Sequence, residues 1–363
     1  MMQTYKLWEI FNLKQWSHLA VNDLLDSWFA VFGANWKIGY YDRYMYEEPM
    51  VLVSCRWANC GSINLTEPKS WVTWNSIALV PNWKIDIDTD FLYYILKGTK
   101  FNDVISGSAQ PQIIVWNLTN KVVGIPPLAT QRAIADKLDK LQSLIDLKKQ
   151  AIIKTDELAK SIFLEMFGDP VKNEKEWEVK KFGEIIKIDA KMVDPKKEEY
   201  KKLVHIWGAN IESETWKLHN LKTAETEGII SWKFLIDKKH ILFSKIRPKL
   251  KKICYPQVTA LCSADIYPMT VNEEKLNQHY LMYYLLWDQF TSIVSEMAEK
   301  RAQIPKVNRE ELEQINFPLP PLPLQQKFAD IITQIDAQKS EHKLALAKLE
   351  ELYQAEMQES FSL

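Results

Sequence analysis

Apolar side chains recur along residues 134–166 at alternating steps of four and three positions. This spacing places them on one face of a helix and leaves polar side chains on the other faces. Two polar residues, Lys148 and Thr155, occupy places in the same seam. A seam of this period predicts a long helix that packs against another helix, as in a coiled coil. The apolar members are Ile134, Leu138, Leu141, Ile145, Ile152, Ala159, Ile162 and Met166.

A second run near the end of the sequence follows the same frame. A pair of prolines precedes each run, at 126–127 and 320–321. Proline lacks the backbone N–H that a helix interior needs, so each pair fixes where its helix begins. About 36 residues that rise ~1.5 Å each give a rod of roughly 54 Å. One apolar seam of that length is unfavourable in water, and we therefore expect the two rods to pack on each other in antiparallel directions. The apolar members of the second seam are Phe328, Ile332, Ile335, Leu346, Leu349 and Tyr353.

The two runs also match residue by residue when the sequence is shifted by 194 positions without gaps. The shift gives 13 identities between residues 126 and 167, among them Gln131 with Gln325 and Phe167 with Phe361. Because the register never slips, this segment is a duplicated element of constant length.

A mixed region of strands and helices precedes each run. An offset of 190 aligns the two regions, for example Leu52 with Leu242 and Tyr94 with Tyr284. Aromatic residues at such periods are expected in the core. The predicted strands are 50–57, 70–80 and 240–250, and the predicted helices are 91–98 and 280–290.

The repeat predicts an α+β protein in which two similar mixed α/β domains are separated by two long antiparallel coiled-coil-like helices, with an internal pseudo-twofold symmetry. Two half-sites on B-DNA have the same symmetry. The predicted division is a first domain at 1–124, a helix at 125–168, a second domain at 169–318 and a second helix at 319–363.

Composition indicates a globular protein, with 47% hydrophobic and 26% charged residues in 363. The N-terminus has no basic segment followed by an apolar run, and no uncharged stretch approaches the ~20 residues that span a bilayer. We therefore expect a cytoplasmic protein. The net charge of −1 is unevenly distributed, because residues 171–306 contain 24 Lys and Arg against 19 Asp and Glu, a net of +5.

Motifs for catalysis or metal binding are missing from the sequence. It contains no Walker A loop, no glycine-rich cofactor fingerprint and no H-E-x-x-H. The four cysteines lack the tight pair spacing of zinc sites and are expected to be buried free thiols. Asp169, Glu178 and Lys180 faintly match a metal-dependent nuclease signature, but an exposed linker rich in Lys and Glu produces such a match by chance. We expect no catalytic residue and no metal in this chain.

The sequence resembles the DNA specificity subunits of type I restriction-modification systems over essentially its whole length. The features that carry the resemblance are the "PPL…Q…A" segments at 126–135 and 320–329, the stretch "ILFSKIRPKL" at 241–250, and the paired segments "GSAQPQI" and "KRAQIPKV". The resemblance implies two target recognition domains, each of which reads one half of a split DNA sequence. It also implies a non-catalytic role beside two methyltransferase subunits and further restriction subunits. Those partners would bind S-adenosylmethionine, ATP and Mg²⁺.

Residues 238–252 are the most basic stretch, with seven Lys and Arg and no acid. On a strand and its turns, such charges neutralise phosphates, although a solvated charged face is the alternative. Arg, Asn and Gln are the side chains that pair with base edges. The predicted DNA-binding residues are Arg56, Asn59, Ser108, Gln110, Asn210, Lys245, Arg247, Lys249, Lys251, Lys252, Arg301 and Gln303.

Two other functions fit the same pattern. One is the specificity subunit of a related bifunctional restriction enzyme, which would read DNA in the same way. The other is a coiled-coil scaffold that binds proteins and no DNA. The two differ in a titration of DNA binding against salt, because only a DNA reader loses affinity as salt rises.

Overall fold

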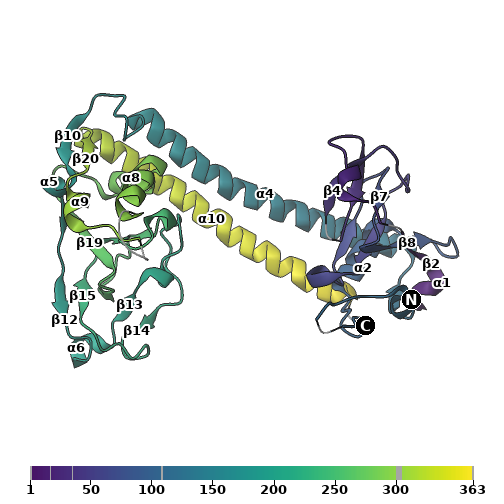
Figure 1. Cartoon of the computed structure of the whole chain (residues 1–363). Helices are drawn as coiled ribbons and strands as arrows, with labels where there is room; N and C mark the ends of the chain where they lie inside the picture. Colours follow the sequence, from purple (N-terminus) through teal and green to yellow (C-terminus); the bar gives the residue numbers. More distant parts are fainter. Residues whose placement is uncertain (1, 17, 35, 108, 300–304, 362–363) are drawn as a thin grey trace. The chain divides into compact units, whose positions relative to one another are not determined.

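The chain folds into two compact units. The structure, a computed structural model, describes residues 2–16, 18–34, 36–107, 109–299 and 305–361 (Figure 1). The first unit comprises Met1–Gln150 and His342–Leu363, and the second unit comprises Ala151–Glu341. Each unit therefore contains a globular part and about half of each of two long helices.

Three β-sheets occur in the described part of the first unit. Strands β1 and β9 form an antiparallel pair, a four-stranded antiparallel sheet has the order β2-β8-β5-β6, and a smaller sheet has the order β4-β3-β7. The elements are β1 (Gln3–Lys6), α1 (Leu7–Ile10), β2 (Phe11–Gln15), β3 (Phe29–Phe32), β4 (Lys37–Tyr41), β5 (Val51–Ser54), β6 (Ile63–Leu65), β7 (Trp71–Val72), β8 (Ser76–Pro81), α2 (Thr89–Gly98), α3 (Val115–Thr119) and β9 (Val122–Ile125).

The second unit repeats this construction. Its antiparallel pair is β10 with β20, its four-stranded sheet has the order β11-β19-β16-β17, and its further sheet has the order β12-β15-β18-β13-β14. The elements are β10 (Glu178–Lys181), α5 (Phe182–Ile185), β11 (Ile186–Ile188), β12 (Lys191–Val193), α6 (Glu198–Lys201), β13 (Val204–Ile206), β14 (Lys222–Thr223), β15 (Lys233–Ile236), β16 (Ile241–Ser244), β17 (Ile253–Cys254), β18 (Ala260–Cys262), β19 (Ile266–Val271), α7 (Gln278–Leu286), α8 (Asp288–Glu299), α9 (Arg309–Glu313) and β20 (Asn316–Leu319).

The four-stranded sheets of the two units are equivalent strand by strand. Strand β5 lies between β8 and β6 just as β16 lies between β19 and β17. The residues of β5 and β16 are buried, which explains why both strands are continuous apolar runs that end in serine. A capped helix follows each sheet, because the side chain of Asp88 accepts a hydrogen bond at the start of α2 and that of Asn277 does so at the start of α7. The predicted internal repeat of mixed domains is confirmed.

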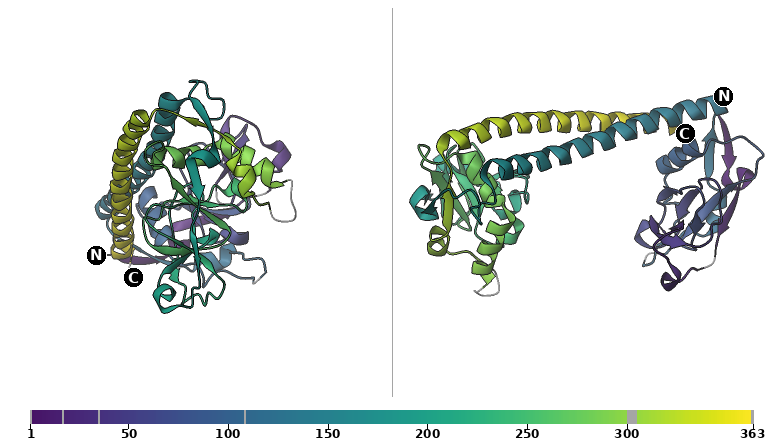
Figure 2. Two further views of the ribbon diagram at one scale, coloured as in Figure 1. Left: turned by 90° about the vertical axis from the view of Figure 1, so that its left-hand side faces the viewer. Right: turned by 90° about the horizontal axis from the view of Figure 1, so that it is seen from above.

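The two long helices are α4 (Leu128–Phe167) and α10 (Leu322–Phe361), each of 40 residues. They lie side by side (Figure 2). In the first unit Leu138 of α4 belongs to the same core as Tyr353 of α10. In the second unit the other half of α4 meets the start of α10 in a second core. The start of one helix therefore packs on the end of the other, and the predicted antiparallel pairing is confirmed.

Polar members of the helical seam have partners that make their position tolerable. The Nζ of Lys148 lies 3.4 Å from Nδ1 of His342, on the facing helix. The hydroxyl of Thr155 donates to the backbone carbonyls of Ala151 and Ile152 in its own helix, at 3.1 and 2.7 Å. These contacts explain why the seam continues through two positions that are not apolar.

One predicted strand is divided in two, and two other predicted elements end earlier than the sequence pattern indicates. The stretch 70–80 forms two strands of different sheets, β7 and β8, because the chain crosses between the sheets at 73–75. Strand β16 ends at Ser244, before Pro248, which has no backbone N–H for pairing. The helix predicted at 280–290 stops at Trp287, whose backbone is extended, and α8 begins directly after it.

The aromatic residues at helical spacing lie in the cores, as predicted. Tyr94 is 3% exposed, and Tyr280 and Tyr284 are 0% and 1% exposed. Phe163 of α4 packs on Tyr280 with ring centroids 5.6 Å apart. Among the described residues no helix is both long and apolar enough to cross a membrane.

Candidate nucleic-acid interface

One loop in each unit continues the buried central strand of the four-stranded sheet. We call residues 55–62, which follow β5, the first exit loop, and residues 245–252, which follow β16, the second exit loop. The backbone N–H of Ser54 donates to the last residue of its loop over 2.8 Å, and that of Ser244 does the same over 3.0 Å. Both loops therefore close against the sheet in the same way.

The exit loops are held by equivalent neighbouring segments. The N–H of Trp57 donates to the carbonyl of Pro111 over 3.0 Å, and the N–H of Arg247 donates to the carbonyl of Pro305 over 3.0 Å. Gln110, which precedes the first of these prolines, is exposed beside the first exit loop. The structure thus places each exit loop beside the segment that contains Pro111 or Pro305, and the sequence predicts DNA-binding residues in both kinds of segment.

The exit loops share an unusual backbone. Trp57 and Arg247 have φ angles of 63° and 49°, and later in each loop Gly61 and Lys251 have φ angles of 89° and 45°. Only glycine adopts this left-handed conformation without steric cost, and other residues lose about 1 to 2 kcal/mol each. Both loops therefore contain a large side chain at a position where it strains the backbone.

Arg56 is fixed in the first exit loop. Its Nη1 donates to Oε1 of Gln112 over 2.7 Å, and its guanidinium carbon lies 5.2 Å from the ring centroid of Trp74. Its Nε is buried and has no hydrogen-bond partner among the described residues. Asn59 is half-buried in the short 3-10 turn of the same loop. Arg56, Asn59 and Gln110 therefore lie around one loop, as an interface would require.

In the second exit loop, Arg247 and Lys249 are exposed. Lys249 forms an ion pair with Glu299 of α8. Lys245 is half-buried, donates to a backbone carbonyl, and lies with its Nζ 5.2 Å from the ring centroid of Tyr267. Burial lowers the pKa of Lys245. Arg247 and Lys249 are thus the most accessible cations of this loop.

The other two lysines of the second exit loop have internal partners. Lys251 forms ion pairs with Glu214, at 3.4 Å, and with Asp288, and its side chain is only 12% exposed. Lys252 donates to the backbone carbonyl of Gly208. The charge of Lys251 is therefore balanced within the protein, and a contact to DNA through this residue stays a prediction.

The basic stretch 238–252 is divided by strand β16. Lys238 and Lys239 are exposed in the turn before the strand, whereas the remaining five cations follow its end. A strand of four residues spans about 13 Å. The seven charges therefore lie in two groups, and the second exit loop contains the larger one.

Asn210 has a structural position. It is 4% exposed, its amide oxygen accepts from the N–H of Trp207 over 3.0 Å, and its amide nitrogen donates to the carbonyls of His219 and Asn220. These contacts occupy the amide groups that Asn210 would need to pair with a base. Base reading by Asn210 stays a prediction, and the contacts give this side chain a structural role. The predicted DNA-binding residues that lie outside the described ones are Ser108, Arg301 and Gln303.

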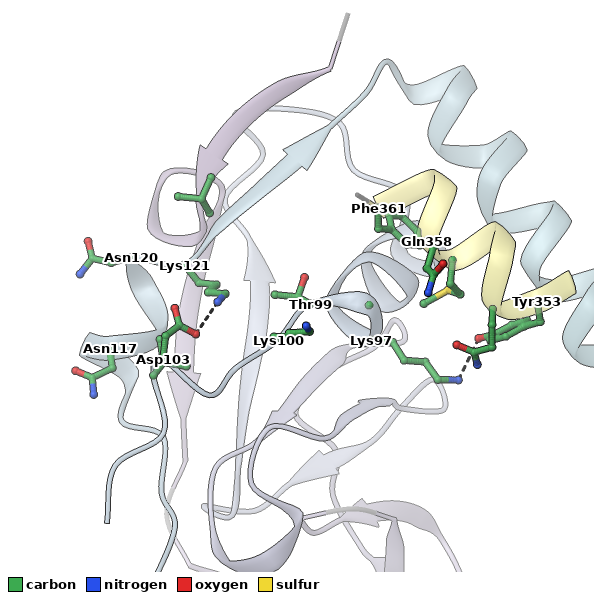
Figure 3. Close-up of a pocket in the computed structure, with 15 residues that line it drawn as sticks. Lys97, Thr99, Lys100, Asp103, Asn117, Asn120, Lys121, Tyr353, Gln358 and Phe361 are labelled. Atoms are coloured by element: carbon green, nitrogen blue, oxygen red, sulfur yellow. Dashed lines mark hydrogen bonds and ion pairs between the residues drawn. The ribbon is translucent and has the colours of Figure 1, made fainter. Parts of the chain in front are cut away.

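A surface pocket of about 1120 Å³ lies elsewhere in the first unit, between the end of α2, the start of β9 and the last turns of α10 (Figure 3). Two of its lysines are engaged by neighbours, because Lys121 pairs with Asp103 at 2.7 Å and Lys97 donates to the hydroxyl of Tyr353 at 3.3 Å. None of the predicted base readers lines this pocket.

The nuclease-like residues have structural partners. Asp169 is 6% exposed and accepts hydrogen bonds from the N–H of Val171 and from the amide of Gln289. Glu178 forms an ion pair with Lys180 at 2.6 Å. No group of three or more potential metal-ligating side chains occurs among the described residues.

Burial disfavours the thiolate forms of the cysteines. Burial raises the pKa of Cys55 to about 11 and that of Cys262 to about 12, and it also raises the pKa of Cys254. Since a thiolate is the nucleophilic form, these side chains are unsuited to nucleophilic chemistry at neutral pH. Cys60 is half-buried and the other three are buried, all as free thiols.

A family model described as the type I restriction modification DNA specificity domain matches residues 2–155 and 174–351. The match covers both units and most of both long helices. This chain belongs to the type I restriction-modification DNA specificity family. The repeat seen in its fold is thus a pair of specificity domains.

Individual relatives agree with this assignment. The specificity subunit of the type I restriction enzyme EcoDI from Escherichia coli is 28% identical over 315 residues, covering 76% of this chain and 70% of that protein. The S subunit of a type I system from M. genitalium has a similar solved fold, with a TM-score of 0.67, 15% identity, and coverage of 98% of this chain and 95% of that one. A chain from a study of complex assembly and conformational transition in a type I system has a TM-score of 0.58 at 16% identity, with coverage of 99% and 97%.

Trp57 of the first exit loop is not among the predicted DNA-binding residues, and it is 57% exposed. It is one of several exposed tryptophans of this specificity-family chain, which also include Trp28 and Trp116. The offset of 190 places Trp57 opposite Arg247, so the repeat itself contained the signal. A comparison of unlike residues at equivalent positions would have found it.

Proposed function

We propose that this chain reads a bipartite DNA sequence, with one unit for each half-site. The observation that carries the proposal is the pair of exit loops, which share a backbone but differ in side chains. The repeated fold provides two similar DNA-reading units. Because the residues of their exit loops differ, each unit reads a different DNA sequence. Trp57 in one loop and Arg247 in the other are the clearest difference.

The residue types around the exit loops suit the two parts of DNA recognition. Exposed lysines such as Lys249 neutralise phosphates and release counterions, which gives affinity without sequence information. Arginine, asparagine and glutamine pair with base edges, and Arg56, Asn59 and Gln110 supply these groups in the first unit. We propose that phosphate contacts position each unit and that a few loop residues select the bases.

Catalysis in this proposal belongs to partner subunits in the cytoplasm. We propose two methyltransferase subunits that bring S-adenosylmethionine to a target adenine, and restriction subunits that use ATP and Mg²⁺. The long helices have apolar side chains that their own pairing leaves uncovered, and such side chains fit docking of other proteins. In the first unit these are Leu144, Leu147, Leu344 and Leu352, which are 45%, 59%, 61% and 49% exposed.

Two other functions remain as alternatives. The specificity subunit of a bifunctional restriction enzyme would read DNA in the same way and would differ only in its partner. A scaffold that binds no DNA would use the exposed leucines of the helices and leave the exit loops without a role.

A salt titration of DNA binding tests the proposal. The assembled complex is titrated on a duplex that contains the sequence methylated in the host and on a duplex of shuffled sequence. We expect tighter binding to the first duplex, and affinity that falls steeply with added salt, by about 0.9 in log K per log salt for each phosphate contact. A scaffold predicts no binding to either duplex, and that result would contradict the proposed function.

A further inference from the structure

We propose that Trp57 and Arg247 are the specificity-determining positions of the two units, where Arg247 pairs with a guanine edge and Trp57 places an apolar ring against bases. This inference rests on the proposed function and deepens it, since it assigns base selection to one named position in each unit.

The two residues occupy the same place in the fold. Each is the donor in the backbone hydrogen bond that ties its exit loop to a proline carbonyl, over 3.0 Å in both units. The residues just before them form equivalent isolated bridges, Arg56 with Gln112 and Ile246 with Lys306. Equivalent backbone hydrogen bonds therefore present different side chains at this position, as at the other positions of the two exit loops.

Neither side chain has a role in folding that explains its presence. Trp57 is 57% exposed and Arg247 is exposed, and both have positive φ angles. Among the described residues, no hydrogen bond, ion pair or ring contact involves either side chain. A residue selected for stability at such a position would be glycine, as Gly61 is later in the same loop. Strained residues that are exposed and uncommitted are typical of binding sites.

The neighbouring contacts hold the backbone of both positions in place. Pro248 follows Arg247 and begins a short 3-10 turn, and the backbone N–H of Lys251, which caps this turn, donates to the carbonyl of Pro248 over 2.8 Å. In the first unit, Arg56 is held between Gln112 and Trp74 directly before Trp57. Both side chains therefore project from loops whose backbone is held by hydrogen bonds, so less backbone entropy is lost when they bind.

The chemistry of the two side chains predicts different reading modes. The arginine guanidinium donates two parallel hydrogen bonds to O6 and N7 of guanine, which discriminates against a wrong base by about 5- to 150-fold. Tryptophan has no such pattern, but its ring contacts a thymine methyl group or enters between base steps. We therefore expect a guanine in the half-site of the second unit, and a preference based on shape and apolar contact in the other half-site.

Trp83 is a matched control for Trp57. It is also tryptophan in the first unit, is 85% exposed and has a φ of 62°. It follows the end of β8, however, whereas the first exit loop follows the end of β5. Because Ser54 at the end of β5 pairs with Ser76 at the start of β8, the two tryptophans lie toward opposite ends of that sheet. Removal of Trp83 should leave specificity unchanged.

The test uses the assembled complex with the variants Trp57→Gly, Arg247→Asn and Trp83→Gly. Glycine and asparagine are the residues that best tolerate positive φ, so all three variants should fold and have a thermal midpoint at or above that of the wild type. Modified-base sequencing gives the methylated motif of each variant in a host, and competition binding gives the discrimination at each base.

We expect Arg247→Asn to relax the motif in one half-site only, by about 5-fold or more, and Trp57→Gly to relax the other half-site only. The Trp83→Gly motif should match the wild type. Unchanged motifs in both exit-loop variants would overturn the inference, as would loss of the partner subunits on a sizing column. Failure of the proposed function looks different, because the wild-type complex would then show no sequence preference at all.

Discussion

Gln131 and Gln325 make the same three hydrogen bonds in the two units. Each amide oxygen accepts from the N–H of the residue that caps the next globular helix, Asp88 at 2.9 Å and Asn277 at 2.7 Å. Each amide nitrogen donates to two backbone carbonyls. The glutamines are 1% and 0% exposed. One buried side chain therefore ties the start of each long helix to its domain.

Replacing Gln131 with leucine should destabilise the protein. The change leaves one backbone N–H and two carbonyls without partners in the interior, which costs about 2 to 4 kcal/mol in the free energy of unfolding. Chemical denaturation measures the loss. Gln142→Leu is the control, because Gln142 makes a single exposed hydrogen bond to Asp146, and its loss should cost under about 0.5 kcal/mol. Equal losses in the two variants would contradict the role of Gln131.

The sequence predicted the helices and the repeat because their signals are local. The paired prolines define where each long helix begins, and the seam of period 3.5 defines which face is buried. Gln131 is part of the sequence motif that the two long helices share. The strained loop positions have no such signal. Nothing in the neighbourhood of Trp57 indicates a left-handed backbone, and its backbone N–H donates to Pro111, far along the chain.

The DNA contacts of the basic stretch stay a prediction, and the structure separates its lysines by their environment. The lysines are adjacent in sequence, but their environments depend on distant acids. Lys251 pairs with Glu214 and Asp288 and its side chain is only 12% exposed, whereas Lys249 pairs with Glu299 and has 71% of its side chain exposed. Of the lysines predicted to contact DNA in the second exit loop, Lys249 is therefore the most accessible one to test.

Lys249→Ala should weaken binding to all DNA sequences about equally. Loss of one phosphate contact reduces the slope of log K against log salt by about 0.9. Lys251→Gly is the comparison variant, because Lys251 is mostly buried between Glu214 and Asp288 and the first exit loop has Gly61 at the equivalent position. We expect its salt slope to be that of the wild type in the same gel-shift assay. A lower slope for Lys251→Gly alone would show that the accessible contact has been misassigned.

Protonation of His205 should destabilise the second unit at low pH. Burial lowers the pKa of His205 below its ordinary value of 6.5, despite a 2.7 Å contact with Glu227. The unfolded chain therefore binds this proton at a higher pH than the folded chain does. The stability associated with neutral His205 is complete above about pH 6.5 and declines as the pH falls toward the folded pKa. Thermal unfolding from about pH 7 to pH 5 should show a smaller decline in the midpoint for His205→Gln than for the wild type.

A longer pair of helices should change the gap between half-sites. Both units share α4 and α10, so inserting four residues in each helix, near 150 and 341, adds about 6 Å of helix. That length corresponds to roughly two base-pair steps of 3.4 Å. Methylome sequencing should report the same half-sites with an altered gap. An unchanged gap would show that the length of the helices does not set the distance between the two half-sites.

The central claim is that the two units of one chain read the two halves of a split DNA sequence. Single-molecule sequencing of modified bases in the host genome, with and without the gene for this chain, tests it most directly. We expect a methylated motif that depends on the gene and consists of two specified half-sites separated by unspecified bases. A contiguous motif, or a methylation pattern unchanged by loss of the gene, would contradict it.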